Sequence, residues 1–183
     1  MKIKNLIFIC LAAISTQVSG QKFWQTSTGK IDFFSKTPVE DIEAHSKAVG
    51  AIVNTETGQL VFKVPIRTFR FPNGLMEEHF NENYMESEKF PDGTFSGKIE
   101  PLIDFTKEGV YNVKAKGKLK IHGVEVEREF TGTIRVNGSE TATLESEMEI
   151  TLADHDIKRP SLVFVKIAEK IAVKAEFVFK PKE

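Results

Sequence analysis

The stretch YNVKAKGKLKIHG, residues 111–123, decides the fold because its first eleven positions alternate apolar and polar side chains. Strict alternation is typical of a β-strand with one buried face and one wet face. The next two residues, His122 and Gly123, predict a tight turn, since glycine accepts backbone angles that other residues avoid. The wet face of this predicted strand carries four lysines, Lys114, Lys116, Lys118 and Lys120.

Residues 124–136 continue the alternation after the turn, now with glutamates at the polar positions Glu125, Glu127 and Glu129. A lysine face beside a glutamate face predicts cross-strand pairs on the outside of a sheet. Residues 111–136 are therefore predicted to form an antiparallel hairpin.

Further segments outward from this hairpin also show a period of two. Turn signals flank them at Thr57-Gly58, Asp92-Gly93 and Asn137-Gly138. The predicted strands cover residues 30–35, 47–54, 60–66, 95–99, 142–152 and 171–179.

One segment, from Asn73 to about Glu88, breaks the alternation. Its apolar residues Met76, Phe80 and Tyr84 recur at helical spacing, and Asn73 is a suitable N-cap. The sequence therefore predicts an all-β chain of about eight antiparallel strands with one helix between the early and the middle strands.

Eight antiparallel strands can close into a barrel around one small ligand, or they can form a sandwich. The period does not separate the two. Small residues at inward positions leave room for a ligand, or they merely fit opposing bulky side chains. These small residues are Ala115, Gly117, Gly132, Ala142 and Ser146.

The N-terminal residues 1–20 have the order of a secretory signal peptide. Lys2 and Lys4 precede an apolar run at residues 6–14, and Val18-Ser19-Gly20 offers a cleavage site. The run is too short to span a bilayer. Cys10, the one cysteine, lies inside this segment, and Phe8-Ile9 before it does not fit a lipid-anchor signal. We expect an exported domain at residues 21–183 that contains no cysteine and depends on its own core.

Composition and motifs exclude several classes of function. The chain has 25 Lys and Arg against 26 Asp and Glu, so it lacks the basic patch of nucleic-acid binders. No nucleophile, metal or phosphate-loop motif is present. We therefore expect a binding protein that is not an enzyme and that uses no metal or cofactor.

The four histidines are the candidate catalytic or metal-ligating groups. Asp154-His155-Asp156 is the best metal candidate, but adjacent ligands suit a metal poorly, and a solvated loop is the preferred interpretation. His79 is interpreted as part of a polar helix flank, His45 as a loop residue and His122 as a turn residue. A hydrolase or metal enzyme using His79 or His155 is the least favoured hypothesis.

Arg128 is unusual because it falls on the same strand face as Val126 and Phe130. It could bind an acidic ligand head or pair with a buried carboxylate. The preferred interpretation is a β-bulge or strand-end position that turns it to solvent.

Three motifs resemble the YceI-like family. They are His79-Phe80-Asn81-Glu82-Asn83-Tyr84-Met85 followed by Lys89-Phe90-Pro91 and Thr94-Phe95, then residues 113–124, and then residues 152–158. Their order and spacing match across roughly the whole mature chain. The sequence departs from the family at His79-Phe80-Asn81, where a His-Leu-Arg helix motif is common. Gly20 and Trp24 are too far apart for the G-x-W motif of true lipocalins.

The resemblance implies a periplasmic, lipocalin-like, eight-stranded antiparallel barrel that binds a polyisoprenoid or other long apolar chain in its lumen. No catalytic residue set is established for that family. The alternative is a closed barrel that serves as an interaction or stress-related module, with the acidic flank Glu77, Glu78, Glu82 and Glu86 as its candidate face.

The expected ligand is an isoprenoid or fatty-acyl chain, because a long apolar chain gains about 0.8 kcal/mol for each buried CH₂. No nucleic-acid partner and no membrane-spanning segment are expected, and the oligomeric state is left open. The expected cover at one end of the lumen is Met76, Phe80 and Tyr84. The expected lumen wall is Phe62, Phe95, Tyr111, Val113, Leu119, Phe130, Leu144 and Met148.

Overall fold

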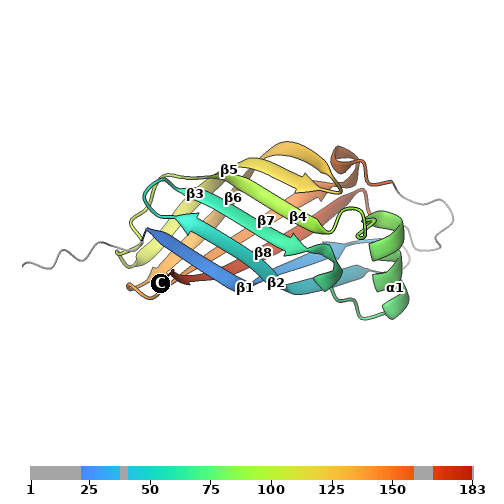
Figure 1. The fold of residues 1–183 in the computed structure, drawn as a ribbon, viewed down its shortest axis with the longest axis horizontal. Helices are drawn as coiled ribbons and strands as arrows, with labels where there is room; N and C mark the ends of the chain where they lie inside the picture. The colour runs from blue at the N-terminus through green and yellow to red at the C-terminus, as the bar shows by residue number, and fades with distance from the viewer. Residues whose placement is uncertain (1–21, 38–40, 159–166, 183) are drawn as a thin grey trace, which may run out of the picture.

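The chain folds into a closed antiparallel barrel of eight strands arranged in sequential order (Figure 1). The computed structural model describes residues 22–37, 41–158 and 167–182. Pairing of β1 with β8 closes the barrel, so the predicted barrel is confirmed over the sandwich. The strands are β1 (Phe23–Ser35), β2 (Ile42–Asn54), β3 (Gln59–Pro65), β4 (Asp92–Glu100), β5 (Gly109–Ile121), β6 (Val124–Asn137), β7 (Thr141–Thr151) and β8 (Lys170–Pro181).

The predicted hairpin is the most regular part of the barrel. β5 and β6 pair without a register shift from Gly109 opposite Val136 to Ile121 opposite Val124. His122 and Gly123 make the turn with φ of 51° and 78°. A Cβ at position 123 would also lie 2.5 Å from the Phe90 ring, so both backbone angle and space require glycine there.

The predicted charge pairs lie on the outside of this hairpin. The Lys114 ammonium is 2.7 Å from the Glu129 carboxylate, and Lys118 is 2.9 Å from Glu125. The hydrogen bond from Lys114, helped by its charge, lowers the pKa of Glu129. Cross-strand pairing of the two charged faces is therefore confirmed.

Strands β1 and β2 are longer than predicted. The inward side of β2 begins with Ile42, Ala44 and Ser46 and then changes phase to Val49 and Ala51. His45 therefore lies in a strand, with its side chain exposed, and the prediction of a loop there was wrong. The predicted turn at Asp92-Gly93 was also wrong, because these residues begin β4.

The predicted helix lies between β3 and β4, but it is shorter than expected. Asn73 caps α1 (Gly74–His79) by accepting a hydrogen bond from the Leu75 N–H. A π-helical turn, η2 (Phe80–Tyr84), completes it, and Glu86 with φ of 43° lies beyond its end. In the described part of the chain, no helix is long and apolar enough to cross a membrane. Two 3₁₀ turns are η1 (Ile66–Thr68) and η3 (Leu152–His155).

The two ends of the barrel differ. At the end where the C-terminus lies, the buried Trp24 ring packs on Phe105 with ring centroids 5.2 Å apart. Ile103, close to Phe105 in the sequence, is also buried. At the opposite end, α1 and η2 lie over the rim of the strands (Figure 1). At this end of the barrel the lumen is therefore covered by α1 and η2, which are not part of the sheet.

One of the small inward residues, Gly117, serves strand packing. Gly97 of β4 pairs with Gly117 of β5, and a Cβ at 117 would lie 2.3 Å from the Gly97 Cα. The two glycines let the backbones of β4 and β5 approach closely. Neither glycine lines the two barrel cavities described below.

Candidate ligand-binding site

A cavity of about 130 Å³ lies in the barrel beneath the helix, and we name it the helix-side chamber. No charged side chain is among the described residues that line it. The chamber can therefore hold an apolar group, while it offers no counter-charge to an ionic one. Its lining residues are Ile31, Phe33, Phe62, Val64, Ile66, Phe69, Phe80, Tyr84, Met85, Gly93, Leu119, Ile121, Met148, Ile150, Leu152, Ile157, Ile167, Ile171, Val173 and Ala175.

Aromatic rings hold the helical cover against the strands. The Phe80 ring centroid lies 5.5 Å from that of Phe33, 5.6 Å from Phe69 and 5.1 Å from Phe71. Such tilted and edge-to-face pairs are favourable because the edge of one ring faces the π cloud of another. The cover is thus a packed part of the core, and Phe80 is its central residue.

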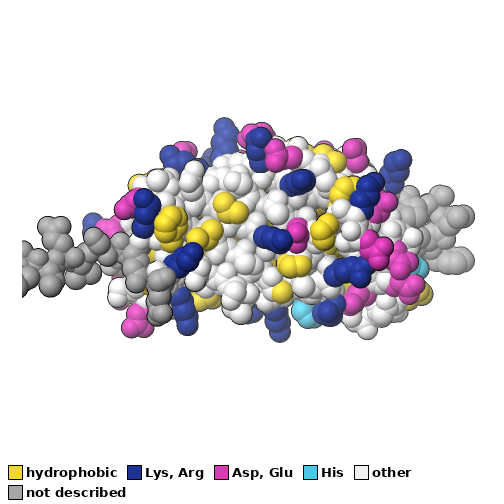
Figure 2. Space-filling view, viewed as in Figure 1, with side chains coloured by type: hydrophobic (Ala, Val, Ile, Leu, Met, Phe, Trp, Pro, Cys, Tyr) yellow, Lys and Arg dark blue, Asp and Glu magenta, His cyan; other side chains and the backbone are white. Residues whose placement is uncertain are grey.

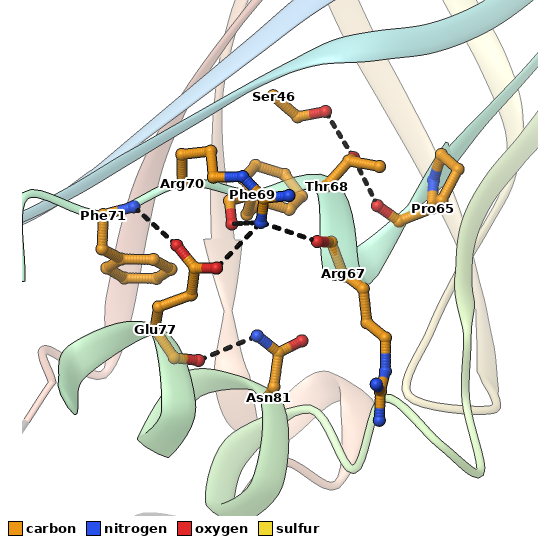
Figure 3. A network of polar contacts seen from close by, with 9 residues as sticks. All are labelled: Ser46, Pro65, Arg67, Thr68, Phe69, Arg70, Phe71, Glu77 and Asn81. Atoms are coloured by element: carbon orange, nitrogen blue, oxygen red, sulfur yellow. Dashed lines mark hydrogen bonds and ion pairs between the residues drawn. The ribbon is translucent and has the colours of Figure 1, made fainter. Parts of the chain in front are cut away.

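Hydrogen bonds tie the same cover to the segment that follows β3 (Figure 3). The Glu77 carboxylate accepts from the Arg70 guanidinium at 2.8 Å and from the Phe71 N–H at 3.3 Å. The Arg70 guanidinium also donates to the carbonyl oxygens of Arg67 and Phe69. The backbones of Arg70 and His45 exchange two hydrogen bonds, so this segment is attached to β2 as well.

The η3 turn covers the other side of the chamber. Within the described residues, β6 pairs with β7 from Gly132 to Asn137, and η3 packs against β6 nearer the hairpin turn. Leu152, the first residue of η3, and Ile157, which follows the turn, both line the chamber. They are joined by a hydrogen bond from the Ile157 N–H to the Leu152 carbonyl.

His155 is fully buried at the end of η3, so the prediction of a solvated loop was wrong for this residue. Its Nδ1 lies 3.2 Å from the Val124 carbonyl oxygen, and its Nε2 has no partner among the described residues. Burial lowers the pKa of His155, only partly offset by the hydrogen bond to Val124. The neutral ring, protonated at Nδ1, fits this position.

His122 links η3 to the helical cover. Its Nε2 lies 2.9 Å from the Glu86 carboxylate, and its Nδ1 lies 3.2 Å from the His155 carbonyl oxygen. The Phe90 ring packs edge-on against it, with centroids 4.5 Å apart. His122 is therefore a turn residue, as predicted, and it also joins the two parts of the cover.

Arg128 forms an ion pair with Asp154 at the surface of this region. The pairing of β5 and β6 is continuous through Arg128, and Arg128 lies inside β6, so the preferred interpretation of a β-bulge or strand-end position was wrong. Its side chain is 24% exposed and that of Asp154 is 42% exposed. The pairing with a carboxylate was one of the alternatives left open, although this carboxylate is not buried.

A second, smaller cavity of about 30 Å³, here the inner chamber, lies deeper in the barrel. Predicted wall and cover residues divide between the two cavities. Leu119, Phe80 and Tyr84 line the helix-side chamber, and Phe62 and Met148 line both. The predicted wall residues that line the inner chamber alone are Phe95, Val113, Phe130 and Leu144, together with the small residues Ala115, Gly132 and Ser146.

Two predicted site residues line neither chamber. Tyr111 is half-buried on β5, and its hydroxyl donates to the Lys107 carbonyl at 3.0 Å, near the end closed by Trp24. Met76 is half-buried on α1, one turn before Phe80. The helical spacing was right, but the inward residues of the cover are Phe80, Tyr84 and the following Met85.

Sequence reasoning missed much of the chamber wall. Val64, Ile150 and Ile171 lie on predicted strands and carried the alternation that could have identified them. Ile66 and Leu152 end the alternation of two predicted strands, although the structure places them in η1 and η3. Phe69 and Ile157 lie outside strands, where no local period marks a residue as inward.

The acidic flank proposed as an interaction face is not a single surface. Glu77 turns to Arg70, and Glu86 turns to His122, which leaves Glu78 and Glu82 exposed. Figure 2 shows acidic side chains beside basic ones at the end where the helix lies. Among the described residues, no group of three or more His, Cys, Asp or Glu side chains is placed to hold a metal ion. His79 is half-buried at the end of α1.

Solved structures share this fold at low sequence identity. A polyisoprenoid binding domain from Saccharophagus degradans is 11% identical, with a TM-score of 0.75, over 88% of this chain and 99% of that one. BcnA from Burkholderia cenocepacia is 18% identical, with a TM-score of 0.69, over 82% and 95% of the two chains. The YCEI protein of Campylobacter jejuni is 17% identical, with a TM-score of 0.62, over 81% and 90%.

No match was found among curated proteins. The family of YceI-like domains, in contrast, matches residues 12–179, which is most of the sequence. The match includes all three motifs on which the resemblance was based and every strand except the last residues of β8. This chain therefore belongs to the YceI-like domain family.

Proposed function

We propose that this protein is an exported binding protein that holds one apolar chain, of isoprenoid or fatty-acyl type, in its barrel. The observation that carries the proposal is the helix-side chamber, a cavity of about 130 Å³ without a charged lining residue. Burial of each CH₂ contributes about 0.8 kcal/mol, so such a wall binds a chain without a polar anchor. The description of the Saccharophagus degradans neighbour as a polyisoprenoid binding domain supports the same ligand class.

The proposal includes a non-enzymatic role and a periplasmic location. The arrangement of Lys2, Lys4 and the apolar run before Gly20 supports export, and the resemblance to the family supports the periplasm. Residues 1–20 lie outside the described residues. Sequencing the N-terminus of the protein recovered from the periplasmic fraction tests both points, since cleavage before Gln21 is expected.

Native mass spectrometry of the protein purified from its own periplasm tests the binding role, with organic extraction of any bound molecule. A matched pair of variants on one strand assigns the site. Val64 faces the chamber, whereas Val61 on the same strand faces outward and is 44% exposed. Val64→Trp should remove bound chain and Val61→Trp should retain it. Ile121→Phe, at a half-buried lining position, repeats the test if Val64→Trp does not fold.

The alternative function, a closed interaction module, is a defined outcome of the same experiment. A wild-type protein that is purified without ligand, and that takes up no added isoprenoid or fatty acid, would support that alternative. Equal binding by the Val64 and Val61 variants would instead move the ligand out of the helix-side chamber.

A further inference from the structure

The two cavities in the barrel are separated by three side chains. Phe62, Met148 and Ala175 line both the helix-side chamber and the inner chamber. They come from β3, β7 and β8, which surround the lumen. We name these three residues the neck, because any chain that passes from one chamber to the other must pass between them.

The Phe62 ring is held in the neck from two sides. It stacks on Phe95 with centroids 5.4 Å apart and an interplanar angle of 18°. It also meets Phe177 at 5.4 Å, although β1 and β2 stand between β3 and β8 in the strand order. The contact with Phe177 therefore crosses the lumen.

The rings behind Phe62 cannot move aside easily. Phe95 and Phe177 are each 1% exposed, and Phe95 also packs on Phe130. The wall behind Phe177 is Gly29, where even a Cβ would lie 2.7 Å from the ring. Close packing on both sides keeps Phe62 across the lumen.

The volume on the open side of the neck limits the ligand. A chamber of about 130 Å³ is slightly smaller than an apolar cavity of about 150 Å³ that holds one benzene molecule. The inner chamber adds only about 30 Å³ and lies behind the neck. Carbons beyond the first few have no apolar wall to contact, so they gain no burial energy.

We propose that Phe62 closes the lumen at the neck, so that this protein selects short apolar chains over long polyisoprenoids. The accepted chain is of the size of about one isoprene unit or a short acyl tail. The selection rests on the proposed function, because it concerns the same chamber and the same ligand class. A lumen closed at the neck sets a sharp limit on chain length, whereas a lumen open from end to end would set none.

Calorimetric titration with a series of prenyl alcohols tests the limit on the full mature protein. The series is prenol, geraniol, farnesol, geranylgeraniol and solanesol. For the wild type, affinity should not rise from prenol to geraniol or to any longer alcohol. Phe62→Ala joins the two chambers and should raise the affinity for geraniol relative to prenol by about tenfold, the gain from burying two further CH₂ groups.

Phe179→Ala is the matched control. It removes a ring of the same size that also packs on Phe177, with centroids 6.2 Å apart. Phe179 lines neither chamber. It should lower stability and leave the preference for chain length unchanged. Phe62→Leu, which keeps an apolar side chain in the neck, provides a second variant with a smaller change if Phe62→Ala does not fold.

The outcomes separate the inference from the function on which it rests. Wild-type binding that strengthens steadily up to solanesol would overturn the length limit alone, and so would the same preference in the Phe62 and Phe179 variants. Binding of no prenyl alcohol by any of these proteins would overturn the proposed function and the length limit together.

Discussion

The Nδ1 atom of His155 lies 3.2 Å from the carbonyl oxygen of Val124, 31 residues earlier in the chain. This contact joins η3 to the edge of β6 beside the hairpin turn. A buried edge carbonyl costs free energy unless a donor reaches it, and the His155 ring supplies that donor. The contact therefore closes the barrel wall next to the helix-side chamber.

Protonation of His155 should destabilise the protein in mild acid. Burial lowers the pKa of His155 in the folded state below 6.5, its ordinary value, so the unfolded chain takes up the proton first. Above pH 6.5 the histidine is neutral in both states and adds no pH dependence. As the pH falls below 6.5, stability falls by at most about 1.4 kcal/mol for each pH unit, until the folded state is protonated too.

Urea unfolding at several pH values between neutral and mildly acidic measures this effect. His155→Asn keeps a side-chain N–H near Val124 and cannot take up the proton, so its stability should depend less on pH than that of the wild type. His45→Asn is the control, since the His45 side chain is exposed on β2. An unchanged pH dependence in His155→Asn would show that other groups cause the acid effect.

The barrel could be predicted from the sequence where alternation is uninterrupted, as between Tyr111 and Val136. β1 and β2 were only partly predicted because their pairing shifts register between Thr26 and Ile31. On β2 the shift places two exposed residues, Lys47 and Ala48, next to each other, so the alternation is interrupted and the residues before them were not recognised as part of the strand.

The cover was harder to predict than the wall. Phe80 and Tyr84 follow helical spacing and were found, but His155 was not. Its neighbours Asp154 and Asp156 are typical of a solvated segment. The carbonyl that the His155 ring contacts belongs to Val124, which begins β6 and is distant in the sequence. Only tertiary contacts bury His155. The neck was missed for the same reason, because period shows that Phe62 faces inward but not that Phe177 meets it across the lumen.

Gly117→Ala should unfold or severely destabilise the protein, by more than about 3 kcal/mol. A Cβ there would lie 2.3 Å from both the Gly97 Cα and the Ser96 carbonyl oxygen, and backbone atoms cannot rotate away. Gly50→Ala on β2 is the matched control, because its Cβ would meet only the Thr26 oxygen at 4.0 Å.

Thermal or urea unfolding compares the two glycine variants. Gly50→Ala should change stability by less than about 1 kcal/mol. A Gly117→Ala protein as stable as Gly50→Ala would contradict the close approach of β4 and β5.

Glu77→Ala should loosen the helical cover while the strands stay intact. The substitution removes the acceptor of the Arg70 and Phe71 hydrogen bonds, at a cost of about 1–2 kcal/mol. Amide hydrogen exchange should become faster in α1 and η2 and stay unchanged in β5 and β6. Glu78→Ala, at the exposed neighbouring position, should leave the exchange of α1 close to that of the wild type. Equal exchange in the two variants would show that the Glu77 carboxylate does not hold the cover.

A brominated fatty alcohol should quench a tryptophan placed in the cover but not the native Trp24. Trp24 packs on Phe105 at the end of the barrel opposite the helix, whereas Phe80 lines the helix-side chamber. Bromine quenches indole fluorescence only at short range. In Phe80→Trp, bromodecanol should therefore reduce the emission of the introduced indole, and in the wild type the emission should stay constant. Phe23→Trp, at an exposed position beside Trp24, controls for quenching by alcohol in solution. Quenching of Trp24 in the wild type would place the chain at the other end of the barrel, behind the neck.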